Sequence, residues 1–248
     1  MIGNKQKIAF FLPNIFTALN MACGFVSIIL SMTGQFDKAC MILILGSIFD
    51  SVDGRVARLT GTQSSFGEQF DSMSDIITFG IAPSFLVYFY YFQSFGRVGI
   101  VISFIFLLCA ALRLARFNSN IEKVGSVFFQ GLPSPAAALA VIGLVLLSIE
   151  FSILKDTLII PGALVVLFAS LMITNVPFNS LKQSKWIRKN RRYFLIFIFI
   201  LILLTLSYHE IMVGLVIYSY IFISLIYFLL NRGELGDIFK WEEKEDDL

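Results

Sequence analysis

Residues 50–58 read D-S-V-D-G-R-V-A-R, and residues 67–75 read G-E-Q-F-D-S-M-S-D. Both stretches lie in segments that are otherwise apolar enough to enter a bilayer. The first stretch puts two aspartates and two small residues on one helical face, at offsets of three, four and seven: Asp50, Asp53, Gly54 and Ala57. The second stretch repeats every four residues and predicts a stripe on the next helix: Gly67, Asp71 and Asp75.

If these two helices are antiparallel neighbours, their stripes place four carboxylates in one small volume. Close carboxylates repel one another strongly in a medium of low dielectric, so they need cations or must take up protons. A cluster of hard oxygen ligands indicates Mg²⁺, Mn²⁺ or Ca²⁺ rather than zinc. A charged side chain at the bilayer centre costs about 3 kcal/mol or more, which favours a functional role. The structural alternative is a cation site without chemistry, or buried salt bridges from these carboxylates to Arg55 and Arg58.

The composition is that of an integral membrane protein and excludes a soluble domain. Of 248 residues, 57% are hydrophobic and 15% are charged, and the mean hydropathy is +0.83. The three cysteines lie in apolar stretches without C-x-x-C spacing and are interpreted as core residues: Cys23, Cys40 and Cys109. The only histidine, His209, is expected in a loop between apolar segments. No nucleic-acid partner is expected. The first apolar run lacks a cleavage site and is expected to be a first span.

The apolar runs predict an all-α, polytopic transmembrane bundle of about eight helices. The expected spans are residues 9–31, 36–58, 68–93, 98–117, 132–150, 157–175, 193–208 and 211–230. If the last two form a hairpin that dips partway into the bilayer, the number falls to six or seven. With no repeat or soluble segment visible, residues 1–248 are predicted to form one membrane domain, with an acidic tail from about residue 233.

Basic residues orient the bundle by the positive-inside rule. A cytoplasmic N-terminus puts 16 of the 19 Lys and Arg residues inside and leaves Lys38, Arg97 and Lys155 outside. The basic stretch at residues 182–192 is interpreted as a topology anchor that attracts anionic headgroups. The bias predicts that the aspartates lie near the cytoplasmic ends of the second and third helices, within reach of a water-soluble nucleotide.

Every fixed position of the pattern D-x-x-D-G-x-x-A-R-x8-G-x3-D-x3-D is present at residues 50–75. This pattern resembles the signature of the CDP-alcohol phosphatidyltransferases. Within that family the chain looks most like the membrane-bound phosphatidylserine synthases, because of three further stretches: L-P-N-I-F-T-A-L-N-M-A-C-G-F at 12–25, A-L-R-L-A-R-F-N at 111–118 and F-Q-G-L-P-S-P-A-A-A at 129–138. The resemblance covers a little over half of the chain.

The resemblance implies transfer of a phosphatidyl group from CDP-diacylglycerol to L-serine, with release of CMP. Two divalent ions, Mg²⁺ or Mn²⁺, held by Asp50, Asp53 and Asp71 would clamp the diphosphate. The family implies that Asp75, a fourth ligand, accepts the proton of the incoming hydroxyl. Seven residues are expected to contact the CDP-lipid: Asn14, Thr17, Gly54, Ala57, Arg58, Ser64 and Gly67. The family also implies a homodimer in contact with membrane lipids.

A serine acceptor is a zwitterion, and its carboxylate needs a cation near the metal site. Arg113 and Arg116 lie three residues apart at the end of one predicted helix, and Asn118 follows them. These three residues are expected to bind the acceptor, although by position alone the arginines fit a membrane-boundary role equally well. Glu68 is one place where the acceptor ammonium could be met.

Two other functions compete with this prediction. The same chemistry could use glycerol 3-phosphate or an inositol phosphate as acceptor, but such a pocket needs more basic side chains than two arginines. A divalent-cation transporter could also use the aspartates. Against it, the carboxylates gather towards one end of the bundle, and no helix-breaking Gly/Pro pairs flank them symmetrically.

Overall fold

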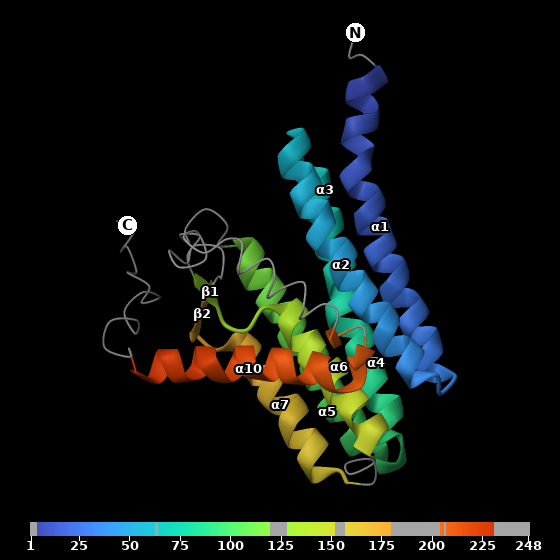
Figure 1. Ribbon diagram of the computed structural model, residues 1–248, viewed down its shortest axis with the longest axis vertical. Helices are drawn as coiled ribbons and strands as arrows, with labels where there is room; N and C mark the ends of the chain where they lie inside the picture. The colour runs from blue at the N-terminus through green and yellow to red at the C-terminus, as the bar shows by residue number, and fades with distance from the viewer. Residues whose placement is uncertain are drawn as a thin grey trace, which may run out of the picture.

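The chain forms an all-α bundle, seen in a computed structural model that describes residues 4–62, 64–119, 128–151, 157–179, 204–205 and 207–230. Figure 1 shows the helices and their labels. The long helices are α1 Asn4–Met32, α2 Phe36–Thr60, α5 Gly96–Ser119, α6 Ser134–Phe151, α7 Ile159–Ile173 and α10 His209–Leu230. Between α2 and α5 lie α3 Ser65–Asp75, η1 Ile76–Ile81, α4 Ala82–Val87, η2 Tyr88–Phe92 and η3 Gln93–Phe95.

The chain from α3 to η3 is one continuous helical run with two wider segments. Both η1 and η2 are π-helical, and η1 begins immediately after Asp75. A π-helical turn holds an extra residue and is frequent at functional sites. The run reverses into α5 at Gly96, which has a φ of 55° that suits glycine. Gly99 then packs directly on Phe92, since a Cβ at Gly99 would lie 2.2 Å from the Phe92 carbonyl oxygen.

The helices α1 and α2 form an antiparallel pair that carries the candidate site. Both extend beyond the rest of the bundle at the upper end of Figure 1. The turn between them contains Gly34, with a φ of 76°. Hydrogen bonds pin the following run onto α1: the Ser74 hydroxyl donates to the Thr17 carbonyl at 3.1 Å, and the Thr78 hydroxyl donates to the Asn20 carbonyl at 3.0 Å. Because α1 contacts both α2 and α3, it aligns the two aspartate stripes.

The apolar core lies around α6, most of whose side chains are buried. In Figure 1, α10 lies across the other helices instead of running beside them. The crossing of α6 and α10 is close because a Cβ at Gly143 would lie 2.7 Å from the Gly214 Cα atom. Small residues at a crossing let two helix backbones approach each other within a membrane protein.

Two short strands, absent from the predictions, join distant segments. β1 Phe128–Gln130 pairs antiparallel with β2 Pro177–Asn179, and Phe129 lies opposite Phe178. Gly131 follows β1 with a φ of 75°, and a Cβ there would lie 2.4 Å from the Met172 carbonyl oxygen. The pairing holds the start of α6 against the end of α7.

Four stretches within the described residues are long and apolar enough to cross a membrane: Pro13–Met32, Ser65–Ser119, Ser134–Phe151 and His209–Leu230. The helix α7 is apolar but shorter, and its 15 residues span about 22 Å. These helices confirm an all-α membrane bundle. Described helices coincide with the predicted spans except for 193–208, most of which lies outside the described residues. The number eight therefore stays a prediction, and so does the basic anchor at 182–192.

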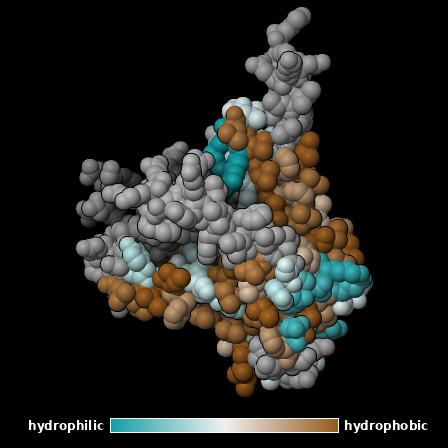
Figure 2. Space-filling view, in the orientation of Figure 1, coloured by the Kyte–Doolittle hydropathy of each residue, from teal (hydrophilic) through white to brown (hydrophobic). Residues whose placement is uncertain are grey.

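Apolar side chains also cover much of the outer surface. Figure 2 shows hydrophobic residues along the flank of α1, with hydrophilic residues gathered near the upper ends of α2 and α3 and near the turn between α1 and α2. Exposed apolar residues on this flank include Phe25, Ile29 and Met32. An apolar belt between two hydrophilic ends is the surface expected of a membrane-embedded bundle.

Candidate active site

The loop between α2 and α3 sets the direction of the second aspartate stripe. The helix α2 ends at Gly61, which has a left-handed φ of 64°. Ser64 then caps α3, since its hydroxyl accepts a 3.1 Å hydrogen bond from the Gly67 backbone N–H. A Cβ at Gly67 would lie 3.4 Å from Oδ1 of Asn14, so the first turn of α3 lies close to α1. Gly61 and the Ser64 cap thus turn the chain back towards the carboxylates of α2.

The two stripes meet, as the sequence predicted. Asp50, Asp53 and Asp71 each offer a carboxylate oxygen, and these oxygens lie within 4.8 Å of one another. The Asp75 carboxyl lies within hydrogen-bonding reach of Asp50. Asp53 is 5% exposed, and buried Oδ1 atoms of Asp71 and Asp75 have no hydrogen-bond partner. An all-oxygen set with unsatisfied acceptors fits a hard divalent cation. The residues present therefore suit the Mg²⁺ or Mn²⁺ that the sequence implies.

The salt-bridge alternative does not fit this geometry. Among the described residues, the ion pairs within 4.0 Å all involve His209, and neither Arg55 nor Arg58 pairs with an aspartate. Both arginines are exposed, and the Arg58 guanidinium lies over Gly54, where a Cβ would be 3.5 Å from Nη1. The carboxylates are therefore not neutralised by salt bridges to these side chains.

A cavity of about 190 Å³ adjoins the carboxylates between α1, α2 and α3. All seven residues that were expected to contact the CDP-lipid line it: Asn14, Thr17, Gly54, Ala57, Arg58, Ser64 and Gly67. Asp53, Asp71 and Glu68 also line it. Pro13 and Thr62 also line the cavity and were not predicted. Their places in the chain could have indicated this, because Pro13 precedes Asn14 and Thr62 lies two residues before Ser64.

Arg113 lies on α5, on the side of the carboxylate cluster where Asp75 is found. Its side chain is 9% exposed, and Nη1 donates a 2.7 Å hydrogen bond to the Ser134 hydroxyl at the start of α6. Its charge interacts with that of Asp75, and its Nε–H has no hydrogen-bond partner. A buried cation with a free donor near the cluster remains available to an anionic group. Ser134 was not predicted as a site residue, although it lies in the quoted stretch at 129–138.

Arg116 has a different environment from Arg113. Its two terminal nitrogens donate to oxygens at the end of α7 and on β1, at 2.8–3.5 Å, from Ile173, Met172, Thr174, Gln130 and Asn175. A cation at the C-terminal carbonyls of a helix stabilises that helix end. These contacts favour a structural role for Arg116. Asn118 lies nearer the site, since its amide donates a 3.0 Å hydrogen bond to the hydroxyl of Ser72, next to Asp71.

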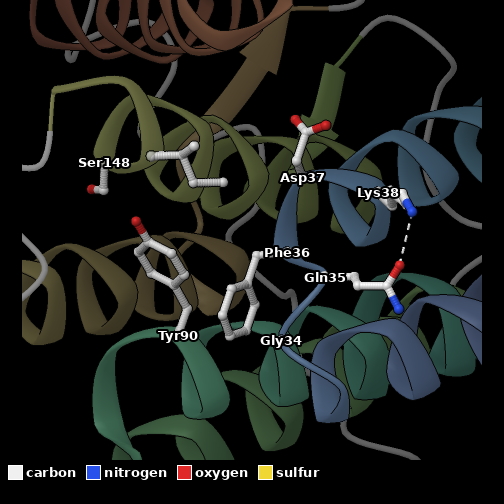
Figure 3. Close-up of a pocket in the computed structure, with 8 residues that line it drawn as sticks. Gly34, Gln35, Phe36, Asp37, Lys38, Tyr90 and Ser148 are labelled. Carbon is white, nitrogen blue, oxygen red and sulfur yellow. Dashed lines mark hydrogen bonds between the residues drawn. The ribbon is translucent and has the colours of Figure 1, made fainter.

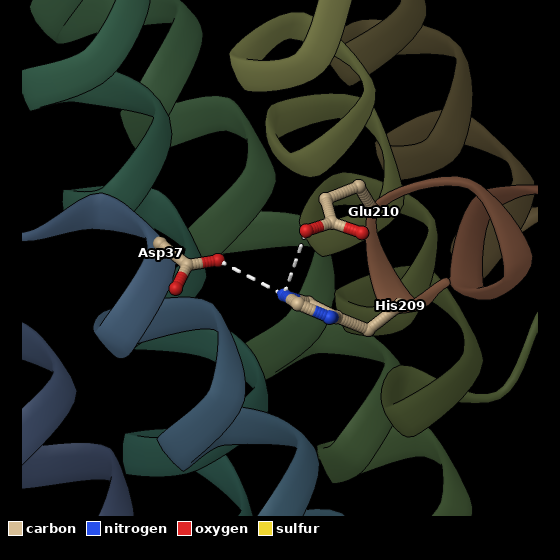
Figure 4. A network of polar contacts seen from close by, with 3 residues as sticks. All are labelled: Asp37, His209 and Glu210. Carbon is tan, nitrogen blue, oxygen red and sulfur yellow. Dashed lines mark hydrogen bonds and ion pairs between the residues drawn. The ribbon is translucent and has the colours of Figure 1, made fainter. Parts of the chain in front are cut away.

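A larger cavity, about 390 Å³, lies at the opposite end of α1 and α2. Figure 3 shows its lining, with Lys38 directed to Gln35, to which it donates a 2.9 Å hydrogen bond. Asp37 at this cavity also contacts His209, whose Nε2 lies 3.3 Å from Oδ1 of Asp37 and 3.3 Å from Oε1 of Glu210 (Figure 4). The expectation that His209 lies in a loop is wrong: it begins α10 and joins that helix to α2. Of the described residues, those grouped closely enough to hold a metal ion are Asp50, Asp53 and Asp71, and none of them lines this cavity, so it is not the candidate active site.

The sequence model of the CDP-alcohol phosphatidyltransferase family matches residues 10–162, which run from within α1 to the start of α7 and include every aspartate of the cluster. The chain belongs to the CDP-alcohol phosphatidyltransferase family. The match confirms the resemblance that the signature at residues 50–75 carried.

Relatives within this family share much of the chain. It is 41% identical over 197 residues to a protein of Helicobacter pylori named CDP-diacylglycerol–serine O-phosphatidyltransferase, covering 79% of this chain and 81% of that one. It is 41% identical over 142 residues to the archaetidylserine synthase of Methanothermobacter thermautotrophicus, covering 56% and 60%. A CDP-diacylglycerol–serine O-phosphatidyltransferase of Methanocaldococcus jannaschii is 39% identical over 163 residues, covering 65% and 70%.

Proposed function

We propose that the protein transfers a phosphatidyl group from CDP-diacylglycerol to L-serine, forming phosphatidylserine and CMP. The observation that carries this proposal is the cluster of Asp50, Asp53 and Asp71, whose oxygens lie within 4.8 Å beside a cavity lined by the family signature. Such a cluster suits a diphosphate, because the negative charge of both partners requires cations between them. This transfer is a step of phospholipid biosynthesis.

The names of the relatives support serine as the acceptor. The proteins of Helicobacter pylori and Methanocaldococcus jannaschii are named for serine and CDP-diacylglycerol. The Methanothermobacter thermautotrophicus protein is named for a different lipid but again for serine. The shared word in these names is the acceptor, which favours serine over glycerol 3-phosphate or an inositol phosphate.

We assign Asp50, Asp53, Asp71 and Asp75 as ligands of two divalent ions, Mg²⁺ or Mn²⁺. When bound, the ions supply neutralisation of the diphosphate and stabilisation of the departing CMP. The chain's own part is to orient the carboxylates: Thr17 donates a 2.9 Å hydrogen bond to Oδ2 of Asp53. This bond fixes one carboxylate from the neighbouring helix.

The cavity residues bind the donor in this proposal. Gly54 and Ala57 leave room for the nucleotide to approach the backbone of α2. The Arg58 guanidinium lies over Gly54 and is free of ion pairs, so it can contact a phosphate oxygen. Asn14 and Thr17 face the cavity from α1, where they can hydrogen-bond the cytidine or its ribose. Ser64 and Gly67 complete the wall at the start of α3.

The acceptor binds on the α5 side of the carboxylate cluster, away from the cavity that binds the donor. Asp75 takes the proton from the serine hydroxyl, and its partnerless Oδ1 is the atom available for it. The free Nε–H of Arg113 points to a contact with the serine carboxylate. Asn118 borders this side through Ser72. Arg116 was predicted to share the carboxylate, but its hydrogen bonds to the end of α7 leave that part to Arg113.

We also propose the setting of this enzyme. Residues 1–248 form one multi-pass domain of the cell membrane, and the aspartates face the cytoplasm. The placement of basic residues supports this orientation, because most Lys and Arg residues fall on the predicted inner side. Family membership favours a homodimer surrounded by membrane lipids.

The decisive experiment is an acceptor panel. Purified protein is given CDP-diacylglycerol and Mn²⁺, and CMP release is measured with serine, glycerol 3-phosphate, an inositol phosphate or no acceptor. We expect CMP release with serine at least 100-fold faster than with the two phosphorylated acceptors, because one buried arginine cannot neutralise a phosphate dianion as well as a carboxylate. Equal or faster release with glycerol 3-phosphate would overturn the serine assignment.

A further inference from the structure

Asn20 is a fully buried amide that the described contacts leave unsatisfied. The residue is 0% exposed, and neither its Oδ1 nor its Nδ2 has a hydrogen-bond partner. Its backbone carbonyl, in contrast, accepts a bond from Thr78. A buried amide without partners costs about 1–3 kcal/mol, so its presence in a native chain calls for an explanation. An apolar side chain of similar size, such as leucine, would avoid that cost.

The antiparallel register of α1 and α2 places Asn20 opposite Asp50. Thr17 on α1 bonds to Asp53 on α2 at 2.9 Å. Three residues further along α1 is Asn20, and three residues back along α2 is Asp50. In an antiparallel pair these two steps run in the same direction in space. Asn20 and Asp50 therefore face each other about one helical turn from Thr17 and Asp53, towards the start of α2.

Contacts at Gly46 place the amide on the same side of α2. A Cβ at Gly46 would lie 3.2 Å from Oδ1 of Asn20, and Gly46 precedes Asp50 by one helical turn. Side chains of a helix lean towards its N-terminus, so the Asp50 carboxylate leans towards the turn that Gly46 occupies. The place of a side chain at Gly46 is taken by Thr78, Cys23 and Asn20, so the Asn20 amide lies against α2 one helical turn from Asp50, with Oδ1 towards Gly46.

The two carboxylates of α2 differ in their support. Asp53 is held by the Thr17 hydroxyl, whereas Asp50 is within reach only of another carboxyl, that of Asp75, among the described contacts. Metal-binding carboxylates are themselves hydrogen-bonded by neighbouring groups, and loss of such a partner typically costs about 10–100-fold in affinity or activity. By the register of α1 and α2, Asn20 lies at the position that corresponds to Asp50, and its Nδ2 is a buried donor without a partner.

We propose that Asn20 is a positioning residue: once a divalent cation is bound, its Nδ2 donates to Asp50 and orients that carboxylate towards the cation, as Thr17 orients Asp53. This inference rests on the proposed function, since it assigns Asn20 to the same site. It explains why α1 carries a polar residue where packing alone favours an apolar one. It also makes α1 the helix that fixes both carboxylates of α2.

The test compares Asn20→Leu with the matched control Ser27→Ala, another buried polar residue on α1 whose hydroxyl is satisfied by the Ala39 carbonyl at 3.1 Å. In detergent, Mn²⁺ affinity is measured by calorimetry and stability by thermal unfolding. We expect Asn20→Leu to weaken Mn²⁺ binding about 10-fold while its unfolding temperature without metal stays equal or rises, because an unsatisfied amide is removed. Ser27→Ala should bind Mn²⁺ as the unmodified protein does.

Kinetics give a second readout. Asn20→Leu should lower kcat about 10-fold at saturating Mn²⁺ and leave the KM for CDP-diacylglycerol unchanged, because the donor cavity does not include Asn20.

Unchanged Mn²⁺ affinity would overturn the proposal, whether or not the variant is less stable. If Asn20→Leu fails to fold, Asn20→Ser, which is smaller and too short to reach, carries the same comparison. If the unmodified protein releases no CMP with any acceptor, the proposed function fails, whereas the Mn²⁺ comparison still decides the role of Asn20.

Discussion

The Thr17 hydroxyl donates a 2.9 Å hydrogen bond to Oδ2 of Asp53, and this bond links α1 to α2 inside the carboxylate cluster. Thr17→Val keeps the shape of the side chain and removes the donor. We expect about 10-fold weaker Mn²⁺ binding, measured by calorimetry. Thr17→Ser keeps the hydroxyl and should restore most of the affinity. Equal loss in both variants would mean that packing by the Thr17 methyl group, not the hydrogen bond, matters.

Removal of one carboxylate should be more severe. Asp53→Asn keeps the size of the side chain but removes the charge that a cation requires. CMP release should fall by more than about 100-fold, beyond the cost of losing an outer hydrogen-bond partner, and chelation by EDTA should have the same effect. The control is Asp37→Asn, a carboxylate at the other end of α2, which should retain its rate. Full turnover in EDTA would contradict the metal assignment.

Asp75 should be separable from the other carboxylates. Asp75→Asn removes the proposed proton acceptor, so CMP release should fall to the background rate. Asp50, Asp53 and Asp71 remain as proposed ligands in this variant, and the donor cavity does not include Asp75, so CDP-diacylglycerol should still bind in the presence of Mn²⁺, as measured by calorimetry. Loss of donor binding together with turnover would show that Asp75 is needed mainly for the metal site.

The two arginines of α5 should respond differently to replacement by lysine. Arg113→Lys keeps the charge but loses the planar set of donors, so the KM for serine should rise about tenfold while that for the lipid stays the same. Arg116→Lys loses hydrogen bonds to the end of α7 and should destabilise the protein by about 2 kcal/mol with little change in either KM. Thermal unfolding and serine titrations measure both. The opposite pattern would assign the acceptor site to Arg116.

Cysteine labelling tests the orientation of the bundle. The native cysteines Cys23, Cys40 and Cys109 are buried, so they give little background with a membrane-impermeant reagent. Gln35→Cys, beside Gly34, and Ser94→Cys, near Gly96, should label from outside intact cells, whereas Thr60→Cys and Gln183→Cys should label only after the membrane is opened. The reverse pattern would put the aspartates on the outer face.

Local patterns in the sequence were sufficient to predict which carboxylates come together and which residues line the cavity beside them. Helical periodicity aligned Asp50 with Asp53 and Asp71 with Asp75, and the signature spacing fixed the turn between the stripes. The hydrogen bonds of Arg116 could not be found in this way, because most of its partners lie more than 50 residues away, at the end of α7. Likewise, β1 and β2 depend on a pairing between distant segments, and His209 depends on a contact with Asp37.

The π-helical segment η1 separates the chemistry of α3 from the packing of the helices that follow it. It holds the extra residue of a wide turn between Asp75 and α4. Loss of that residue would turn Ile76–Ile81 into an ordinary α-helical stretch and leave the helices on either side facing as before. Loss of one residue from α3 between Asp71 and Asp75 would instead rotate these aspartates by about 100° relative to each other. A single-codon deletion should therefore disable the site within α3 and be tolerated just after it.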